Sequence, residues 1–139
     1  MRTKTEKALN SFPLPSEVVL SGVSEGIVWV IARGVVGLNG YVRVPDNGHP
    51  WSKEFPADEN GWGDWGLDEY LSVHGGVTFA KHPWIGFDTA HAGDNWSAEY
   101  DPRGLSDIIG KSSFGGELWT EDKILLETLA MANQLAAIR

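Results

Sequence analysis

The sequence predicts an α+β fold in which a small antiparallel or mixed β-sheet, long loops rich in glycine and tryptophan, and one C-terminal α-helix share a core. Two observations support this prediction. Short β-branched tracts alternate with glycine-containing turns over most of the chain, and no glycine or proline interrupts residues 119–139. The 139 residues, of which 42% are hydrophobic, suffice for one domain. We therefore expect an irregular N-terminal arm at residues 1–16, where Pro13 and Pro15 lie, and a single α+β domain at residues 17–139.

The strongest strand signal is the apolar, β-branched run Ile27–Arg33, which is typical of a strand buried on both faces. Gly40–Val44 predicts an antiparallel partner strand, with Asn39-Gly40 as a candidate turn. Pro45 and the pair Asn47-Gly48 then end this strand, because proline cannot continue the interior of a ladder. Shorter runs predict further strands at residues 18–20, 71–74, 77–79 and 84–88.

The C-terminal segment predicts the clearest element, a helix. Thr120 is a good N-cap, and Glu121 and Asp122 place negative charge in the first turn, where the helix dipole favours it. Apolar residues recur at helical spacing at Leu125, Leu129, Ala132 and Ala136, flanked by Ile124, Met131 and Leu135. We expect this helix to pack on the sheet and close the core.

Composition excludes several classes of protein. Eleven Lys and Arg against nineteen Asp and Glu leave a net charge of -8, which argues against general nucleic-acid binding because phosphate backbones need clustered cations. The absence of cysteine excludes a disulfide framework, a thiolate metal site and a cysteine nucleophile. No apolar run approaches the roughly 20 residues that span a bilayer, and residues 1–15 lack the apolar core of a signal peptide. We therefore expect a cytoplasmic protein that does not enter a membrane.

The four histidines all lie between residues 49 and 91, and three of them adjoin turns at the ends of predicted strands. His49 precedes a proline, His74 precedes a Gly-Gly pair, and His91 lies among small residues. Loops at strand ends commonly present functional groups on a rigid sheet. These three histidines are therefore candidate ligand-binding residues.

The spacing Asp88-x-x-His91-x-x-Asp94 is the main candidate for chemistry. If the chain turns after the strand, these side chains converge, and two carboxylates with an imidazole are ligands that Zn or Mn accepts. His74 or His49 would complete the metal set, and the same groups could act in acid–base catalysis. The alternative is structural, with the aspartates accepting hydrogen bonds from turn N–H groups and His91 held in a loop. The pattern leaves both a divalent-metal site and the absence of any cofactor open.

The glycines Gly75 and Gly76 permit two interpretations. They would allow a ligand to approach the backbone closely, or would aim N–H groups at an anion through positive φ angles. Equally, a hairpin turn or a bulge needs glycine for the backbone alone. Neither the P-loop nor the dinucleotide fingerprint is present.

Tryptophan and arginine supply further candidates. Seven tryptophans are many for this length, and Trp62 and Trp65 lie in the aromatic, acidic segment Trp51–Glu69. These rings could stack on a planar ligand such as a nucleobase, form a protein interface, or bury the loop. Arg43, at the end of a predicted strand, is a candidate for bidentate contact with a phosphate, with a solvated surface charge as the alternative.

Three segments taken together resemble an uncharacterised family of small phage and bacterial proteins. They are Gly40–Pro50 with its His-Pro pair, Val73–Thr78 with His-Gly-Gly-x-Thr, and Trp84–Asp94 with Trp-x-Gly-Phe-Asp-x-Ala-His-x-Gly-Asp. Relative to the family pattern, Gly61–Gly66 is an added aromatic loop. The family carries no assigned activity. Membership would imply a phage origin and a role in manipulating the host from its cytoplasm, including anti-defence activity.

Three functions follow as alternatives, and whether the protein is an enzyme stays open. The first is binding of a small polar, nucleotide-like ligand, which would sequester a host defence signal. The second is a metal-dependent hydrolase that uses the His/Asp cluster. The third is inhibition of a host defence protein through the acidic segment Trp51–Glu69, because complementary charge accelerates association. The candidate ligand-binding residues are Arg43, His49, Trp62, Trp65, His74, Gly75, Gly76, Asp88, His91 and Asp94.

Overall fold

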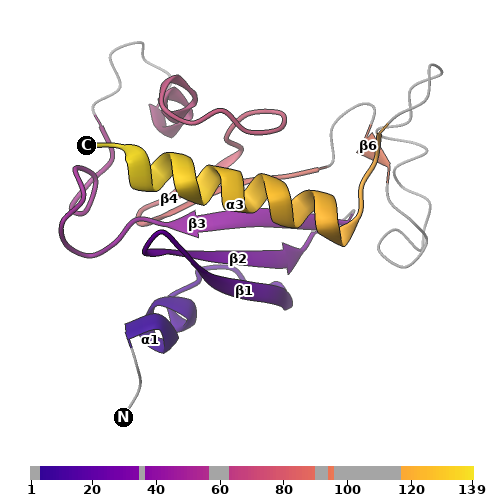
Figure 1. Cartoon of the computed structure of the whole chain (residues 1–139), viewed down its shortest axis with the longest axis horizontal. Helices are drawn as coiled ribbons and strands as arrows, with labels where there is room; N and C mark the ends of the chain where they lie inside the picture. Colours follow the sequence, from indigo (N-terminus) through magenta and orange to yellow (C-terminus); the bar gives the residue numbers. More distant parts are fainter. Residues whose placement is uncertain (1–3, 35–36, 57–62, 90–93, 96–116) are drawn as a thin grey trace.

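A five-stranded antiparallel sheet carries a long helix on one face and a short helix on the other (Figure 1). The computed structural model describes residues 4–34, 37–56, 63–89, 94–95 and 117–139, and the strand order is β1-β2-β3-β5-β4. The strands are β1 (Val18–Ser24), β2 (Ile27–Arg33), β3 (Leu38–Arg43), β4 (Phe79–Lys81) and β5 (Trp84–Phe87). The helices are α1 (Lys4–Asn10), the 3₁₀ helix η1 (Gly63–Glu69) and α3 (Glu121–Ala137), and the short strands β6 (Asp94–Asn95) and β7 (Glu117–Leu118) pair in parallel. These elements confirm the predicted α+β fold.

The side chains of β2 alternate between the two faces of the sheet, and each face has its own apolar cluster. Ile27, Trp29 and Ile31 belong to the cluster that α3 covers. Val30 and Ala32 belong to a second cluster on the opposite face, which α1 and the residues after it cover. β2 is therefore buried on both faces, as its uninterrupted apolar sequence predicts, and its bounds are those predicted.

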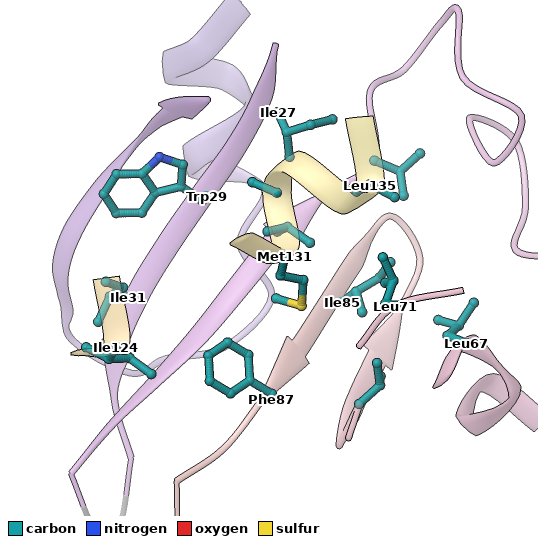
Figure 2. Packing of buried hydrophobic residues seen from close by; sticks show 14 of the residues in the cluster. Ile27, Trp29, Ile31, Leu67, Leu71, Ile85, Phe87, Ile124, Met131 and Leu135 are labelled. Carbon is teal, nitrogen blue, oxygen red and sulfur yellow. The ribbon is translucent and has the colours of Figure 1, made fainter. Parts of the chain in front are cut away.

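α3 closes the larger cluster over β2, β3 and β5 (Figure 2). Thr120 caps this helix as predicted, because its Oγ1 accepts a hydrogen bond from the Lys123 N–H at 3.2 Å. The buried stripe consists of Ile124, Thr128, Met131, Ala132 and Leu135, whereas Leu125, Leu129 and Ala136 are its half-buried flanks. Ala132 is buried as expected, whereas the three residues expected at the margin are buried in place of the other three expected at the centre, and Thr128 joins them. Among the described helices, none combines the length and the apolarity needed to cross a bilayer.

The N-terminal segment differs from the irregular arm expected at residues 1–16. α1 buries Ala8 against the sheet, and the chain after α1 continues the contact. The Phe12 ring lies edge-on to Tyr41, with centroids 4.9 Å apart, and to Trp84, with centroids 5.1 Å apart. This segment is ordered because the second face of the sheet is apolar and needs a cover.

β3 begins at Leu38, so that Asn39 and Gly40 lie inside the strand and do not form a turn. Glycine is needed at position 40 because a side-chain carbon there would collide with the Thr128 hydroxyl group and the Phe87 ring. Because glycine has no side-chain carbon, α3 can approach the sheet closely at this position.

The strands predicted at residues 71–74 and 77–79 are wrong apart from Phe79, the first residue of β4. Side chains of α3 and η1 bind the backbone of residues 72–77 in place of a neighbouring strand, whereas the Thr78 N–H donates to Gly86 O of β5 at 3.0 Å. The bonds join Ser72 N–H to Gln134 Oε1 (2.7 Å), Gln134 Nε2 to Ser72 O (2.9 Å), His74 N–H to Glu127 Oε1 (2.7 Å) and Val77 N–H to Asp68 Oδ1 (2.6 Å). The segment is held firmly without being part of the sheet.

Candidate functional site

A pocket of about 510 Å³ opens between α1, the β1–β2 hairpin and the loop that follows β3. We call it the α1 pocket. It is lined by Lys7 and Ala8 of α1, Val23 and Val28 of the hairpin, Arg43 at the end of β3, and the loop residues Pro45, Asp46 and Asn47. Its volume lies within the range of small-molecule sites, about 300–1,000 Å³.

Arg43 is the central polar group of the α1 pocket. It is the last residue of β3 and pairs with Val28 of β2 and Trp84 of β5, so its position is set by the sheet. Only 14% of its side chain is exposed, and the guanidinium group binds Asp46 Oδ1 at 2.8 Å. A guanidinium held this way is oriented before any ligand arrives, which lowers the entropic cost of binding.

Ser11 connects the guanidinium group to α1 and to the sheet. Its hydroxyl group donates to Ala8 O at 2.6 Å and accepts from Arg43 Nε at 3.1 Å and from Trp84 Nε1 at 3.3 Å. One donor and two acceptor positions are the full capacity of a serine hydroxyl group. Arg43 therefore has a structural role, since it helps to hold α1 on the sheet.

The guanidinium group nevertheless keeps donors for a ligand. An arginine has five N–H groups. Those of Arg43 donate to Ser11 Oγ, to Val44 O at 3.4 Å and to Asp46 Oδ1, which leaves one N–H on each terminal nitrogen. The Asp46 side chain is 74% exposed, so its carboxylate can leave the guanidinium group at little cost in buried contacts.

The remaining walls of the α1 pocket combine a cation, an amide and apolar carbon. Lys7 is exposed and makes no ion pair within the residues that the structure describes. Asn47 can both donate and accept hydrogen bonds. Val23 and Val28 pair across the hairpin and present their methyl groups on the same face. These groups suit a ligand with one anionic end and one apolar or planar end.

A buried phenol lies on the same face of the sheet. The pKa of Tyr41 is raised above its ordinary value, chiefly because burial disfavours the phenolate, while a hydrogen bond from Asn39 acts in the opposite direction. The negative charge of Asp88 raises the pKa further. Asp88 directly follows β5, is half-buried and acts on the Tyr41 phenol, which places it near the face of the sheet that α1 covers, the α1 face.

His49 lies away from this pocket and bonds the main chain through both ring nitrogens. Its Nδ1 accepts from the Trp51 N–H at 2.9 Å, and its Nε2 lies 2.8 Å from Leu135 O. Because a carbonyl oxygen can only accept a hydrogen bond, we place the ring proton of His49 on Nε2. In this arrangement His49 ties the loop after β3 to the last turn of α3.

His74 and the two glycines form a turn beside α3. The His74 ring lies edge-on to the buried Trp119, with centroids 4.6 Å apart. Gly75 and Gly76 have φ angles of 68° and 83°, which both interpretations of these glycines allow. A side-chain carbon on Gly76 would lie 3.0 Å from the Asp68 carboxylate, so an acidic group adjoins this turn. The role of the glycines in binding a ligand stays a prediction.

The described candidates do not gather at one place. Arg43 and Asp88 lie on the α1 face, whereas His49 and His74 contact elements on the α3 face. Within the parts of the chain that the structure describes, no group of three or more His, Asp or Glu side chains could hold a metal ion. His91 and Trp62 lie outside the described residues, and Asp94 and Trp65 are described in their backbone alone, in β6 and η1. The Zn or Mn site with His74, Asp88, His91 and Asp94 therefore stays a prediction.

The segment Trp51–Glu69 begins in the core. The Trp51 side chain is 4% exposed and has edge-on contacts with Phe55, Tyr70 and His49. The acidic docking surface proposed for this segment cannot therefore include Trp51 as a free ring. The other tryptophans of this segment are Trp62, which lies outside the described residues, and Trp65, of which only the backbone is described.

Sequence reasoning found Arg43 but missed Lys7, Asp46 and Asn47. The sequence signal for Asp46 and Asn47 was the turn after Arg43, which the sequence analysis used only to mark the end of a strand and not as part of a binding site. Comparisons of the chain with protein-family models, with curated proteins and with solved structures found no match. The resemblance to a phage and bacterial family stays a prediction.

Proposed function

We propose that this protein binds a small, nucleotide-like ligand in the α1 pocket, with the anionic group of the ligand at Arg43 and Lys7. The observation that carries this proposal is a mostly buried arginine side chain that retains two N–H donors and lines the same pocket as Lys7, for which the described residues provide no ion-pair partner. In a chain of net charge -8, two cations at one pocket are a local exception to the surrounding acidity. Phosphate and carboxylate groups are the ligands that such donors bind best.

The other walls of the α1 pocket indicate the chemistry of the remaining part of the ligand. A planar ring would lie on the methyl groups of Val23 and Val28, because apolar surface there is open to solvent beside the pocket. The Asn47 amide would meet polar atoms at the edge of that ring. A nucleoside phosphate combines these two ends in one molecule.

Asp46 makes the proposed site selective for strong anions. Its carboxylate occupies the Arg43 guanidinium group in the free protein, so a ligand has to displace or share this contact. A phosphate dianion competes better than a single carboxylate, because it carries more charge and more acceptor oxygens.

Calorimetry and thermal unfolding with adenosine 5′-monophosphate, inorganic phosphate and adenosine test the proposal. The nucleotide should raise the free energy of unfolding by about 2.7 kcal/mol at a hundredfold excess over its Kd. Phosphate alone should bind more weakly, and adenosine should lose the salt-dependent part of the affinity. If neither a panel of nucleotides nor phosphate shifts the melting temperature, the protein has no such site.

Three variants make the test specific to the α1 pocket. Lys7→Gln should weaken nucleotide binding and Asp46→Asn should strengthen it, each by up to about fivefold, since exposed ion pairs are worth up to about 1 kcal/mol. Lys53→Gln removes an exposed lysine that does not line the pocket and should leave the affinity unchanged. Equal losses of affinity for Lys7→Gln and Lys53→Gln would indicate nonspecific attraction by net charge.

Recovery of the nucleotide separates binding from catalysis. In the proposed function the ligand leaves the protein chemically intact, which is what sequestration of a nucleotide-like defence signal requires. A converted nucleotide, together with activity that a chelator abolishes and Zn or Mn restores, would instead support the metal-dependent hydrolase. The phage origin on which the defence role depends is a prediction from the family resemblance.

A further inference from the structure

The outer edge of β1 is the longest open strand edge of the main sheet. β1 has seven residues, whereas β4 at the opposite edge has three, and no described strand pairs with the outer side of β1. An open edge presents backbone N–H and C=O groups to which another extended chain can bond. Its chemistry therefore specifies an extended polypeptide as the partner.

The hairpin geometry identifies the residues that face outward. Glu25 and Gly26 have φ angles of 52° and 79°, which defines a two-residue turn of type I′. In such a hairpin the flanking pair, Ser24 and Ile27, exchanges hydrogen bonds. Because the pattern alternates, Ser21 and Val23 turn their N–H and C=O groups away from β2.

The side chains of β1 lack the usual protection of an edge. Five large hydrophobic side chains are exposed in the described part of the chain, and three of them are Val18, Leu20 and Val23. β1 contains no charged residue and no proline, the two common devices against edge pairing. A register irregularity between Val18 and Leu20 interrupts the first half of the strand. The second half, residues 21–24, is a regular edge.

Charge decides between a second copy of this chain and a different partner. Two copies would each bring a net charge of -8, and a pairing centred on Ser21 would set Glu17 opposite Glu25 at both ends. Glu17 is neutralised by Arg33 at 2.9 Å, whereas Glu25 makes no ion pair within the described residues. The uncompensated negative charge lies at the C-terminal end of β1.

We propose that β1 binds an extended segment of a partner protein as an added antiparallel strand. The segment alternates apolar, β-branched residues and carries Lys or Arg at its N-terminal end. In antiparallel pairing that end lies beside Glu25, so the cation meets the exposed carboxylate. Backbone hydrogen bonds to Ser21 and Val23 supply the affinity, and the cation supplies the orientation.

Selection from a surface-displayed library of random dodecapeptides tests this proposal. Peptides are selected on the wild-type protein and then counter-selected on Ser21→Pro, which removes an outward N–H but is tolerated at a strand edge. The enriched peptides should show β-branched residues at alternate positions after a Lys or Arg. Their affinity should fall about tenfold for Ser21→Pro and stay unchanged for Ser21→Ala, which keeps the N–H group.

Two further measurements test the proposal even if Ser21→Pro impairs folding. In a selected peptide, N-methylation of the amide that faces Ser21 should abolish binding to the wild-type protein. Methylation of the next amide should not, because that N–H points away from β1. Glu25→Lys should reverse the preference, so that peptides with Asp or Glu at the N-terminal end bind better. Binding that ignores both changes, the absence of any enrichment, or a dimer of this chain that Ser21→Pro dissociates would overturn the proposal.

Discussion

His49 and Arg43 were both candidate ligand-binding residues, and their neighbours give them different roles. Both ring nitrogens of His49 bond main-chain groups, so this side chain has no capacity left for a ligand without breaking a contact. Arg43 uses one N–H to hold Ser11 and retains others beside an open pocket. A side chain with surplus hydrogen-bonding capacity can serve structure and binding at once.

Replacing His49 should cost stability. His49→Phe keeps a ring of similar shape but leaves the Trp51 N–H without its acceptor and removes one donor from Leu135 O, so the free energy of unfolding should fall by about 1–2 kcal/mol. Urea unfolding followed by tryptophan fluorescence measures this loss. Lys53→Ala, an exposed change in the same region, is the control. An unchanged midpoint for His49→Phe would mean that neither bond contributes.

The raised pKa of Tyr41 predicts a loss of stability in alkali. The native protein holds the phenol proton to higher pH than the unfolded chain does, so the stabilising contribution is complete below pH about 10 and is lost as the pH rises through the higher native pKa. Urea midpoints measured from pH 8 to 11 should fall for the wild type and fall less for Tyr41→Phe. Tyr70→Phe, at an exposed tyrosine, should follow the wild type. Identical alkaline slopes for both variants would refute this origin.

At the scale of elements, side chains of α3 do more than fill the core. Gln134 and Glu127 bind the backbone of residues 71–74, which the alternation of apolar residues predicts as a strand. The helix begins at a cap that is readable from the sequence, yet its buried stripe is centred on Ile124, Thr128 and Leu135. Both differences have the same kind of cause. Apolar residues on adjacent positions of a helix do not determine which face is buried, and apolar alternation in a short segment does not determine which groups will bind its backbone.

Removing the cap of α3 should weaken the whole domain. Thr120→Ala removes the acceptor of the Lys123 N–H and should cost about 1 kcal/mol of stability. Thr120→Ser keeps a hydroxyl acceptor and should restore most of the difference. Thermal unfolding of the three proteins decides the matter, and equal melting temperatures would show that the cap is dispensable.

At the scale of the molecule, the sheet separates two apolar clusters, and each helix covers one of them. α1 is small, but it supplies one wall of the α1 pocket, and the Phe12 ring just after it anchors this segment on Tyr41 and Trp84. Binding of a ligand should therefore depend on how well α1 is docked, even though the larger apolar cluster lies on the α3 side. The α1 face thus carries the proposed binding site, and the α3 face carries the larger apolar cluster.

Paired variants on the two faces test this division. Phe12→Ala removes the edge-on contacts with Tyr41 and Trp84 and should cost about 2–4 kcal/mol, and nucleotide affinity should fall because Lys7 is no longer held at the pocket. Phe55→Ala, which loses contacts with Trp51 and His82 beside the other cluster, should cost stability and leave nucleotide affinity unchanged. Calorimetry at a temperature where both variants are folded compares them. Equal losses of affinity would argue against a pocket at α1.

The sequence by itself determined β2, β5 to within one residue, and the capped helix α3, because β-branched runs and a threonine cap act over a few neighbouring residues. It also identified Arg43 as a candidate for binding an anion. Only the tertiary structure decided that α1 covers the second face, that Lys7, Arg43 and Asp46 share one pocket, and that His49 meets Leu135 across 86 residues. These outcomes depend on burial and on bonds between distant segments, and no local pattern encodes which distant segment will supply the partner.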